Sequence, residues 1–170
     1  MLKFIDHGDN KHQIEDASGV TIGWISGLSV GFRGFATESD AREGAVAACQ
    51  ALNRVLHERC PGGTRHEPAL DRIRTVHDGA YEWFYDGTAP IARLLRPQRR
   101  AYDGSFGVEF VLPSSAGQDV AIPAARSIAS ATAPYREDFT SLPGTDSQIG
   151  TNPSLGRFEG ASTRNLSEGK

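Results

Sequence analysis

Arginines in the middle of the chain are the residues whose type and spacing most clearly suggest chemistry. Arg93, Arg96, Arg99 and Arg100 lie within eight residues, and no acidic residue occurs at positions 87–102. Guanidinium groups bind phosphate oxygens through paired hydrogen bonds, and exposed aromatic rings stack on nucleobases. This segment is therefore a candidate site for phosphate or nucleic acid. The candidate site also includes Arg72, Arg74 and Tyr102.

A purely structural explanation competes with this hypothesis. Tyr81, Trp83 and Tyr85 alternate along a predicted strand, where such side chains usually enter a core. Arginines are also common on long hairpin loops, which they help to keep in solution. The formal net charge of −3 gives the protein no overall positive field that would attract nucleic acid.

A metal site is the next hypothesis to weigh. His57 and Cys60 are three positions apart, and His66 and His77 follow, so the chain offers ligand types that zinc accepts. Their spacing matches none of the usual paired cysteine or cysteine–histidine patterns, and the helix dipole explains a histidine near a helix C-terminus. We therefore expect no metal and no cofactor, with these four residues as weak candidates.

Catalysis has little support in the sequence. Cys49 lies on the apolar side of a predicted helix, where a thiol is normally an inert part of the core. The chain contains neither a phosphate-binding Gly-Lys-Ser/Thr loop nor a His-Glu-x-x-His pair. These observations favour a protein that is not an enzyme, although catalytic residues from distant positions can still converge.

Turn signals divide the chain into short strands. Asp-Gly occurs at residues 78–79, 86–87 and 103–104, and Ser-Gly occurs at residues 18–19. Glycine adopts the positive φ angles that tight hairpins need. Segments rich in β-branched and aromatic residues predict strands at residues 2–6, 11–16, 20–25, 29–35, 72–77, 80–85, 88–96 and 105–112.

The clearest helix is predicted to begin near Glu38. Thr37 can cap this helix by accepting a hydrogen bond from the Asp40 amide, while the Asp40 carboxylate accepts from the Thr37 amide. Apolar residues recur at helical spacing and predict one buried face. That face carries Ala41, Ala45, Ala48, Cys49, Leu52, Val55 and Leu56.

The second half of the chain repeats this plan. Ser105–Phe110 matches Ser29–Phe35 if one residue is skipped, and a helix is predicted to follow at residues 118–131. Asp119 is the expected N-cap of this helix. Pro123 fits only in the first turn, where a missing amide is tolerated.

We therefore predict an α+β fold of two tandem antiparallel β-meander units, each followed by one packing helix. The units cover residues 1–62 and 63–136, and residues 137–170 are predicted to form a disordered, flexible tail because they are rich in Ser, Thr, Gly, Pro and Asn. Each unit alone is marginal in size, so the two should bury surface against each other. We expect either a pseudo-twofold pair of sheets or one continuous sheet with both helices on one side.

The composition limits where in the cell the protein is expected to function. Its apolar runs are far shorter than the roughly 20 residues of a membrane helix, and its first residues lack the apolar stretch of a secretory signal. Two cysteines are too few for a disulfide framework. We expect a cytoplasmic protein that does not associate with membranes.

The leading functional hypothesis is a non-enzymatic binding module that presents its sheets to a macromolecular partner. That partner is expected to be a protein, and exposed strand edges also favour self-association. The alternative is nucleic-acid or phosphate binding through the Arg93–Arg100 loop. A small enzyme or a metal site is the third hypothesis.

Overall fold

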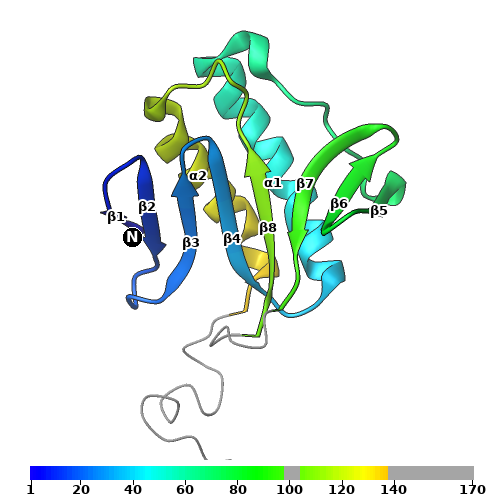
Figure 1. The fold of residues 1–170 in the computed structure, drawn as a ribbon, viewed down its shortest axis with the longest axis horizontal. Helices are drawn as coiled ribbons and strands as arrows, with labels where there is room; N and C mark the ends of the chain where they lie inside the picture. Colours follow the sequence, from blue (N-terminus) through cyan, green and yellow to red (C-terminus); the bar gives the residue numbers. More distant parts are fainter. Residues whose placement is uncertain (98–103, 138–170) are drawn as a thin grey trace, which may run out of the picture. The chain divides into compact units, whose positions relative to one another are not determined.

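The computed structural model describes residues 1–97 and 104–137, which form eight strands and two α-helices (Figure 1). The strands are β1 (Lys3–Asp6), β2 (Lys11–Glu15), β3 (Thr21–Ser26), β4 (Ser29–Phe35), β5 (Ile73–Asp78), β6 (Tyr81–Asp86), β7 (Ala89–Leu95) and β8 (Phe106–Val111). The helices are α1 (Glu38–Arg59) and α2 (Gln118–Thr132), and single 3-10 turns occur at Pro61–Gly63, Leu70–Arg72 and Ala133–Tyr135. The predicted strands agree with these bounds to within one residue at each end.

All eight strands form one antiparallel sheet in the order β1-β2-β3-β4-β8-β7-β6-β5 (Figure 1). The first four strands and the last four are two meanders, which meet where β4 pairs with β8 in the middle of the sheet. This arrangement confirms the α+β class and the expectation of one continuous sheet. Strands β1 and β5 form the two edges.

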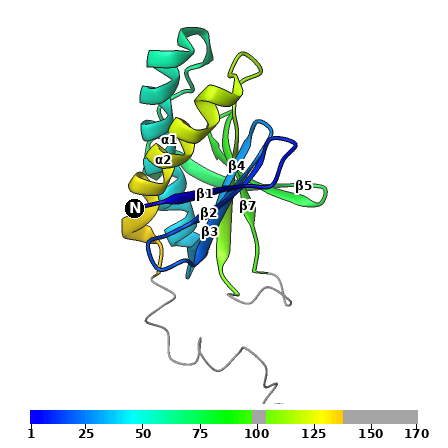
Figure 2. The same cartoon turned by 90° about the vertical axis from the view of Figure 1, so that its left-hand side faces the viewer.

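Both helices lie on the same face of the sheet and pack against each other (Figure 2). Helix α1 follows β4 in the chain but also packs on β7 and β8, whereas α2 packs on β3 and β4. Each helix therefore covers strands of the other meander. The core is shared, and it is not divided along the predicted units 1–62 and 63–136.

The core fills the space between the sheet and the helix layer. Phe32, Phe84 and Phe110 are fully buried there, as is Phe35 at the end of β4. The predicted apolar face of α1 is confirmed, because its residues are all buried: Ala41, Ala45, Ala48, Cys49, Leu52, Val55 and Leu56. The helix approaches the sheet so closely that a Cβ atom on Gly44 would lie 2.5 Å from the Phe35 ring.

The starts of α1 and α2 are both confirmed, but the predicted N-cap of α2 and the predicted place of Pro123 are wrong. The Asp40 amide donates to Thr37 Oγ1 at 3.1 Å, and the Thr37 amide donates to Asp40 Oδ2 at 3.2 Å. In α2 the N-cap is Gly117 rather than Asp119, and Pro123 lies in the second turn. Pro123 has no amide to donate to the preceding turn, so the packing of the buried apolar face must stabilise α2 despite the missing bond.

The hairpin turns form at the glycines that predicted them. Gly19, Gly79 and Gly87 have φ angles of 82°, 59° and 60°, which glycine adopts without strain. The β1–β2 turn adds positive φ angles at Asp9 and Asn10, two residue types that tolerate them. These tight turns help to fix the register of each hairpin, and register decides which side chains share a face.

Some predicted features lie outside the described residues. These are the predicted tail beyond Glu137, together with Arg99, Arg100 and Tyr102 of the predicted phosphate site. Within residues 1–97 and 104–137, neither helix is long and apolar enough to cross a membrane.

Candidate functional site

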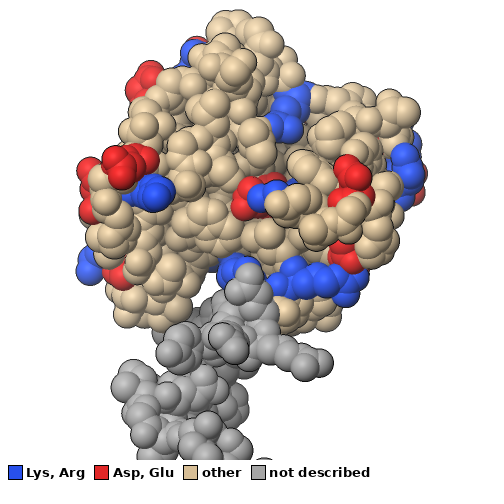
Figure 3. Space-filling model, in the orientation of Figure 1, with Lys and Arg blue, Asp and Glu red and all other residues tan. Residues whose placement is uncertain are grey.

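One face of the sheet is open. The helices cover the opposite face (Figure 2), and no further element of the described chain lies over this one. Strand pairing places one row of side chains on it across all eight strands: Ile5, Gln13, Trp24, Gly31, Glu109, Arg93, Trp83 and Val76. Figure 3 views the molecule from this side and shows a largely uncharged surface, with charged groups near its middle and along its rim. We call this surface the open face.

Strand β6 buries acidic residues and leaves aromatic residues on the open face, which is the reverse of an ordinary half-buried strand. Its acidic residues Glu82 and Asp86 are buried on the helix side beside Phe84. Its other aromatic residues point to the open face: Tyr81, Trp83 and Tyr85. The explanation that placed these three rings in the core is therefore wrong, and it holds only for Phe84. Exposing rings and burying carboxylates both cost free energy, so the contacts around this strand must compensate.

Three arginines stack on aromatic rings of the open face. The pairs, with the distance from guanidinium carbon to ring centroid, are Arg33 with Trp24 (5.9 Å), Arg74 with Tyr85 (5.6 Å) and Arg93 with Tyr81 (4.3 Å). Trp24 also lies flat on Gly31, where an added Cβ atom would be 2.1 Å from its ring. These contacts restrict the rings to defined orientations, so the open face is a preformed surface.

The charges of the open face are only partly balanced. Arg93 forms a salt bridge with Glu109, whose side chain is nearly buried. Arg33 and Arg74 instead donate to backbone carbonyl oxygens, at 3.2 and 3.0 Å. Within residues 1–97 and 104–137, no carboxylate is paired with either guanidinium.

The arginines predicted to bind phosphate are divided among separate contacts. Arg72 donates to Asp86 at 2.8 Å, and Arg96 forms a salt bridge with Glu82. The hydrogen bond from Arg72 holds the pKa of Asp86 below its usual value, and the hydrogen bond with Glu82 raises the pKa of Arg96. With Arg93 also paired, the described arginines do not form one cluster of free cations.

The weak metal candidates do not come together either. His66 Nε2 lies 2.9 Å from Asp86, and His77 Nδ1 lies 3.0 Å from Glu82, at opposite ends of β6. Cys60 contacts a serine hydroxyl. Within the part of the chain that the structure describes, no group of three or more His, Cys, Asp or Glu residues could hold a metal ion.

Two potential nucleophiles lack the surroundings that catalysis needs. Burial raises the pKa of the Cys49 thiol to about 11, so the thiol is protonated at neutral pH. The segment Gly27–Gly31 has Gly-x-Ser-x-Gly spacing, but Ser29 begins β4 within an antiparallel hairpin. A nucleophile elbow instead stands at a strand-to-helix turn. The buried Ser29 hydroxyl has no hydrogen-bond partner among the described residues.

A cleft of about 390 Å³ opens at one end of the open face. Tyr81, Leu95 and Pro97 contribute apolar surface to its lining, and Arg33 contributes positive charge. Arg96 also lines the cleft but is paired with Glu82. A cleft with apolar and basic walls fits a side chain that combines a ring or aliphatic body with a nearby carboxylate.

Local sequence did not reveal which side of the sheet these residues occupy. Trp24 and Trp83 are predicted strand residues, but their side follows from the pairing of β4 with β8, which no turn signal marks. One signal was present in the strand Tyr81–Asp86. Every second residue of this strand is Tyr or Trp, and the residues between them are acidic except for Phe84. Basic residues at Arg74 and Arg93, in the two neighbouring strands, could have indicated that the rings stack with arginines.

Comparison with known proteins adds no further constraint. No family model, no curated protein and no solved structure matches this chain. The chemistry of the open face is therefore the basis on which a function is argued.

Proposed function

We propose that the protein is a non-enzymatic binding module that docks a protein partner on the open face of its sheet. Strand β6 carries this proposal, because it buries two acidic side chains and leaves three aromatic ones on the open face. A strand that served only the fold would bury its rings and expose its acids. Tryptophan, tyrosine and arginine are the residue types that contribute most to binding at protein interfaces.

The partner that best fits this face presents an apolar surface bordered by carboxylates. In the part of the chain that the structure describes, Arg33 in β4 and Arg74 in β5 have no carboxylate partner. A carboxylate placed against either guanidinium gains charge-assisted hydrogen bonds, whereas a basic partner would be repelled. Between these arginines the Arg93–Glu109 salt bridge keeps the surface close to neutral.

The cleft beside Tyr81 supplies an anchor point for such a partner. Apolar surface from Leu95 and Pro97 can bury a ring or aliphatic side chain, and the nearby Arg33 can bind an adjacent carboxylate. Interfaces of this kind draw most of their affinity from a few side chains seated in dry pockets. An acidic segment with one large apolar residue therefore fits both the cleft and the charge of the face.

Nucleic-acid binding has weaker support. Arg72, Arg93 and Arg96 are each paired with a carboxylate of the protein itself. Affinity for nucleic acid depends on free cations that neutralise phosphates and release counterions. The net charge of −3 offers no general attraction for a polyanion. A protein partner is accordingly the better-supported ligand.

A displayed library of short random peptides tests the proposal without knowledge of the natural partner. Peptides are selected on the immobilised full-length protein, and dissociation constants are then measured in solution. The enriched peptides should combine an aromatic or large aliphatic residue with acidic residues. Trp83→Ala and Arg74→Ala should each weaken their binding about tenfold.

Arg54→Ala is the matched control, because Arg54 is exposed on α1 and has no part in the open face. This variant should bind the selected peptides with unchanged affinity. Peptides that bind Trp83→Ala as tightly as the wild type would overturn the proposal. An oligothymidine that binds at low salt, and loses affinity steeply with added salt and with Arg96→Ala, would replace it with nucleic-acid binding.

We also infer that the two ββββα halves are one repeated unit. The hairpins β2–β3 and β6–β7 have register shifts at corresponding places, and Ile22 and Ile91 are the residues skipped there. The pairing of β4 with β8 is centred on Phe32 and Val108, with a glycine opposite a charged residue on either side. These similarities support an approximate twofold relation between the meanders. Self-association through the strand edges stays a prediction.

A further inference from the structure

We propose that a second site, at the β6–β7 turn, binds a phosphate monoester. The pocket has a volume of about 500 Å³ and is lined by His66, Arg72, Arg74, Asp86 and the turn residues 87–89. We call it the turn pocket. It is separate from the cleft beside Tyr81 but shares Arg74 with the open face. Phosphate and the selected peptides are different ligands, so this proposal and the docking of a protein partner can still fail independently.

A buried carboxylate builds the turn pocket. The Asp86 side chain is 1% exposed, and its Oδ2 atom accepts from Arg72 Nη2 at 2.8 Å and lies 2.9 Å from His66 Nε2. Because both groups bind the same oxygen, Arg72 and His66 are held side by side, with 3.1 Å between their nitrogens. Both side chains are otherwise more than half exposed. The carboxylate thus orients the Arg72 guanidinium and the His66 ring, which would be mobile without it.

Arg74 brings a second guanidinium group to the turn pocket. It donates to the Gly87 carbonyl at 3.0 Å and stacks on Tyr85, so its position is also fixed. A guanidinium group has five N–H donors, and these contacts leave several of them free on both Arg72 and Arg74. Thr88 contributes a hydroxyl to the lining. Phosphate oxygens accept hydrogen bonds from such a set of donors, and guanidinium matches their geometry.

The charge of the lining favours an anion. Arg72 and Arg74 carry two positive charges against one negative charge on Asp86. Asp71 acts electrostatically on Arg72 but does not line the pocket. The second carboxylate oxygen of Asp86 is buried, so an entering anion meets the donors rather than this oxygen.

The cleft beside Tyr81 contains a similar trio but suits a different ligand. There Glu82 holds Arg96 and His77, as Asp86 holds Arg72 and His66. Its remaining lining includes leucine, proline and tyrosine side chains, which cannot replace the water around a phosphate dianion. The turn pocket has a glycine, a threonine and an alanine in the corresponding role, so it leaves room and polarity for a compact anion.

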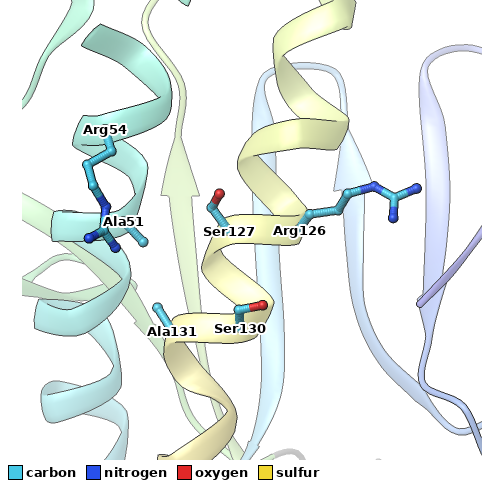
Figure 4. A pocket seen from close by; sticks show the side chains of 6 residues that line it. All are labelled: Ala51, Arg54, Arg126, Ser127, Ser130 and Ala131. Atoms are coloured by element: carbon cyan, nitrogen blue, oxygen red, sulfur yellow. The ribbon is translucent and has the colours of Figure 1, made fainter. Parts of the chain in front are cut away.

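The groove between the helices is also lined by arginines, but it lacks the buried carboxylate that orients the side chains of the turn pocket. This groove has a volume of about 420 Å³ and is lined by Arg54, Arg126 and small residues of α1 and α2. Figure 4 shows Arg126 pointing away from α1, so its guanidinium does not converge with that of Arg54. Arg126 stacks on Phe4 instead. No buried carboxylate lines this groove, so it serves as the control site.

Titration of the full-length protein with inorganic phosphate, followed by heteronuclear NMR at constant ionic strength and near-neutral pH, tests the proposal. The expected result is a saturable shift of the amide signals of His66, Gly87 and Thr88. Arg74→Ala removes donors without touching Asp86 and should raise the dissociation constant about tenfold. The double variant Arg54→Ala with Arg126→Ala should bind phosphate as the wild type does.

Two peptides distinguish the sources of the phosphate group. One is a neutral peptide with a central phosphoserine, and the other is the same peptide with serine. Tighter binding of the phosphopeptide than of inorganic phosphate assigns the turn pocket to a phosphorylated side chain, and equal or weaker binding assigns it to a small phosphate compound. Shifts that do not saturate with any phosphate ligand, or an Arg74→Ala variant with wild-type affinity, would overturn the proposal.

Discussion

The two faces of the sheet carry aromatic residues of different kinds. The helix-covered face holds fully buried phenylalanines, namely Phe32, Phe35, Phe84 and Phe110. The open face holds tryptophans and tyrosines that keep contact with solvent, namely Trp24, Tyr81, Trp83 and Tyr85. Phenylalanine has only apolar surface, whereas tryptophan and tyrosine combine an apolar ring with a polar group that can remain hydrated. The sequence thus uses different aromatic types for folding and for a surface that meets water.

This difference also separates the energetic roles of the two faces. Packing of the phenylalanines against the helices removes apolar surface from water and stabilises the fold. The rings of the open face remain partly hydrated, so they contribute less to folding and keep apolar surface that a partner can bury. Strand β6 contains both roles in adjacent residues, since Phe84 is fully buried and Tyr85 is on the open face. That pair allows the two faces to be compared within one strand.

The largest expected effect comes from truncating these adjacent rings. Phe84→Ala should lower the free energy of unfolding by about 3–5 kcal/mol, because it leaves a cavity in the shared core. Tyr85→Ala should lower it by about 1 kcal/mol, because solvent already reaches the ring. Urea unfolding of both variants, monitored by circular dichroism, gives the two values. Equal losses would contradict the assignment of the two residues to faces with different roles.

A smaller effect is expected from Gly31, which lies under the Trp24 ring. A methyl group at Gly31 would be 2.1 Å from that ring, so Gly31→Ala must displace Trp24 at a cost of about 1–3 kcal/mol. The displaced indole should shift the tryptophan fluorescence, and the selected peptides should bind more weakly. Gly62→Ala is the control, since no atom lies within 4 Å of a Cβ atom there. Unchanged fluorescence in Gly31→Ala would mean that the ring is not held on this glycine.

Asp86 of β6 gives the covered face a dependence on pH. The hydrogen bond from Arg72, assisted by His66, holds the pKa of Asp86 below its usual value. The folded protein therefore binds this proton less readily than the unfolded chain does. The resulting stabilisation is complete above the unfolded pKa of about 4, and it is lost as the pH falls through the lower folded value.

Asp86→Asn tests this dependence because asparagine cannot ionise. The variant should lose less of its free energy of unfolding than the wild type does when the pH is lowered from neutral to about 3. Urea unfolding at the two pH values provides the comparison. Asp9→Asn, in the exposed β1–β2 turn, should keep the wild-type dependence. If Asp86→Asn keeps it as well, the buried acid does not contribute to stability as its contacts indicate.

The order of the elements was predictable because local chemistry determines it. Turn glycines and the Thr37 cap set the bounds of most strands and of α1, and these bounds were confirmed. The predicted place of Pro123 was wrong. A proline is expected in the first turn of a helix, whereas the packing of α2 stabilises Pro123 in the second turn. Local signals give the elements, but tertiary packing can override them.

The open face was not predictable from local signals. Which side of β6 is buried depends on where α1 lies, and α1 packs on strands that follow it in the chain. The arginines were identified as candidates, but their partners Asp86 and Glu82 were not, because these pairs join separate strands or loops. The alternation in β6 is compatible with either side being buried, and only the shared core decides between them.

The smallest expected effect compares one kind of contact on the two sides of the sheet. Arg33 stacks on Trp24 of the open face, and Arg126 of α2 stacks on Phe4, at centroid distances of 5.9 and 4.9 Å. Stacking of an exposed arginine contributes about 0.5–1 kcal/mol, so Arg33→Ala and Arg126→Ala should lower stability by similar small amounts. Only Arg33→Ala should weaken binding of the selected peptides, by about tenfold, because only Arg33 lies on the open face, where we propose that a partner docks. If Arg33→Ala and Arg126→Ala weaken peptide binding equally, the peptides do not bind specifically to the open face.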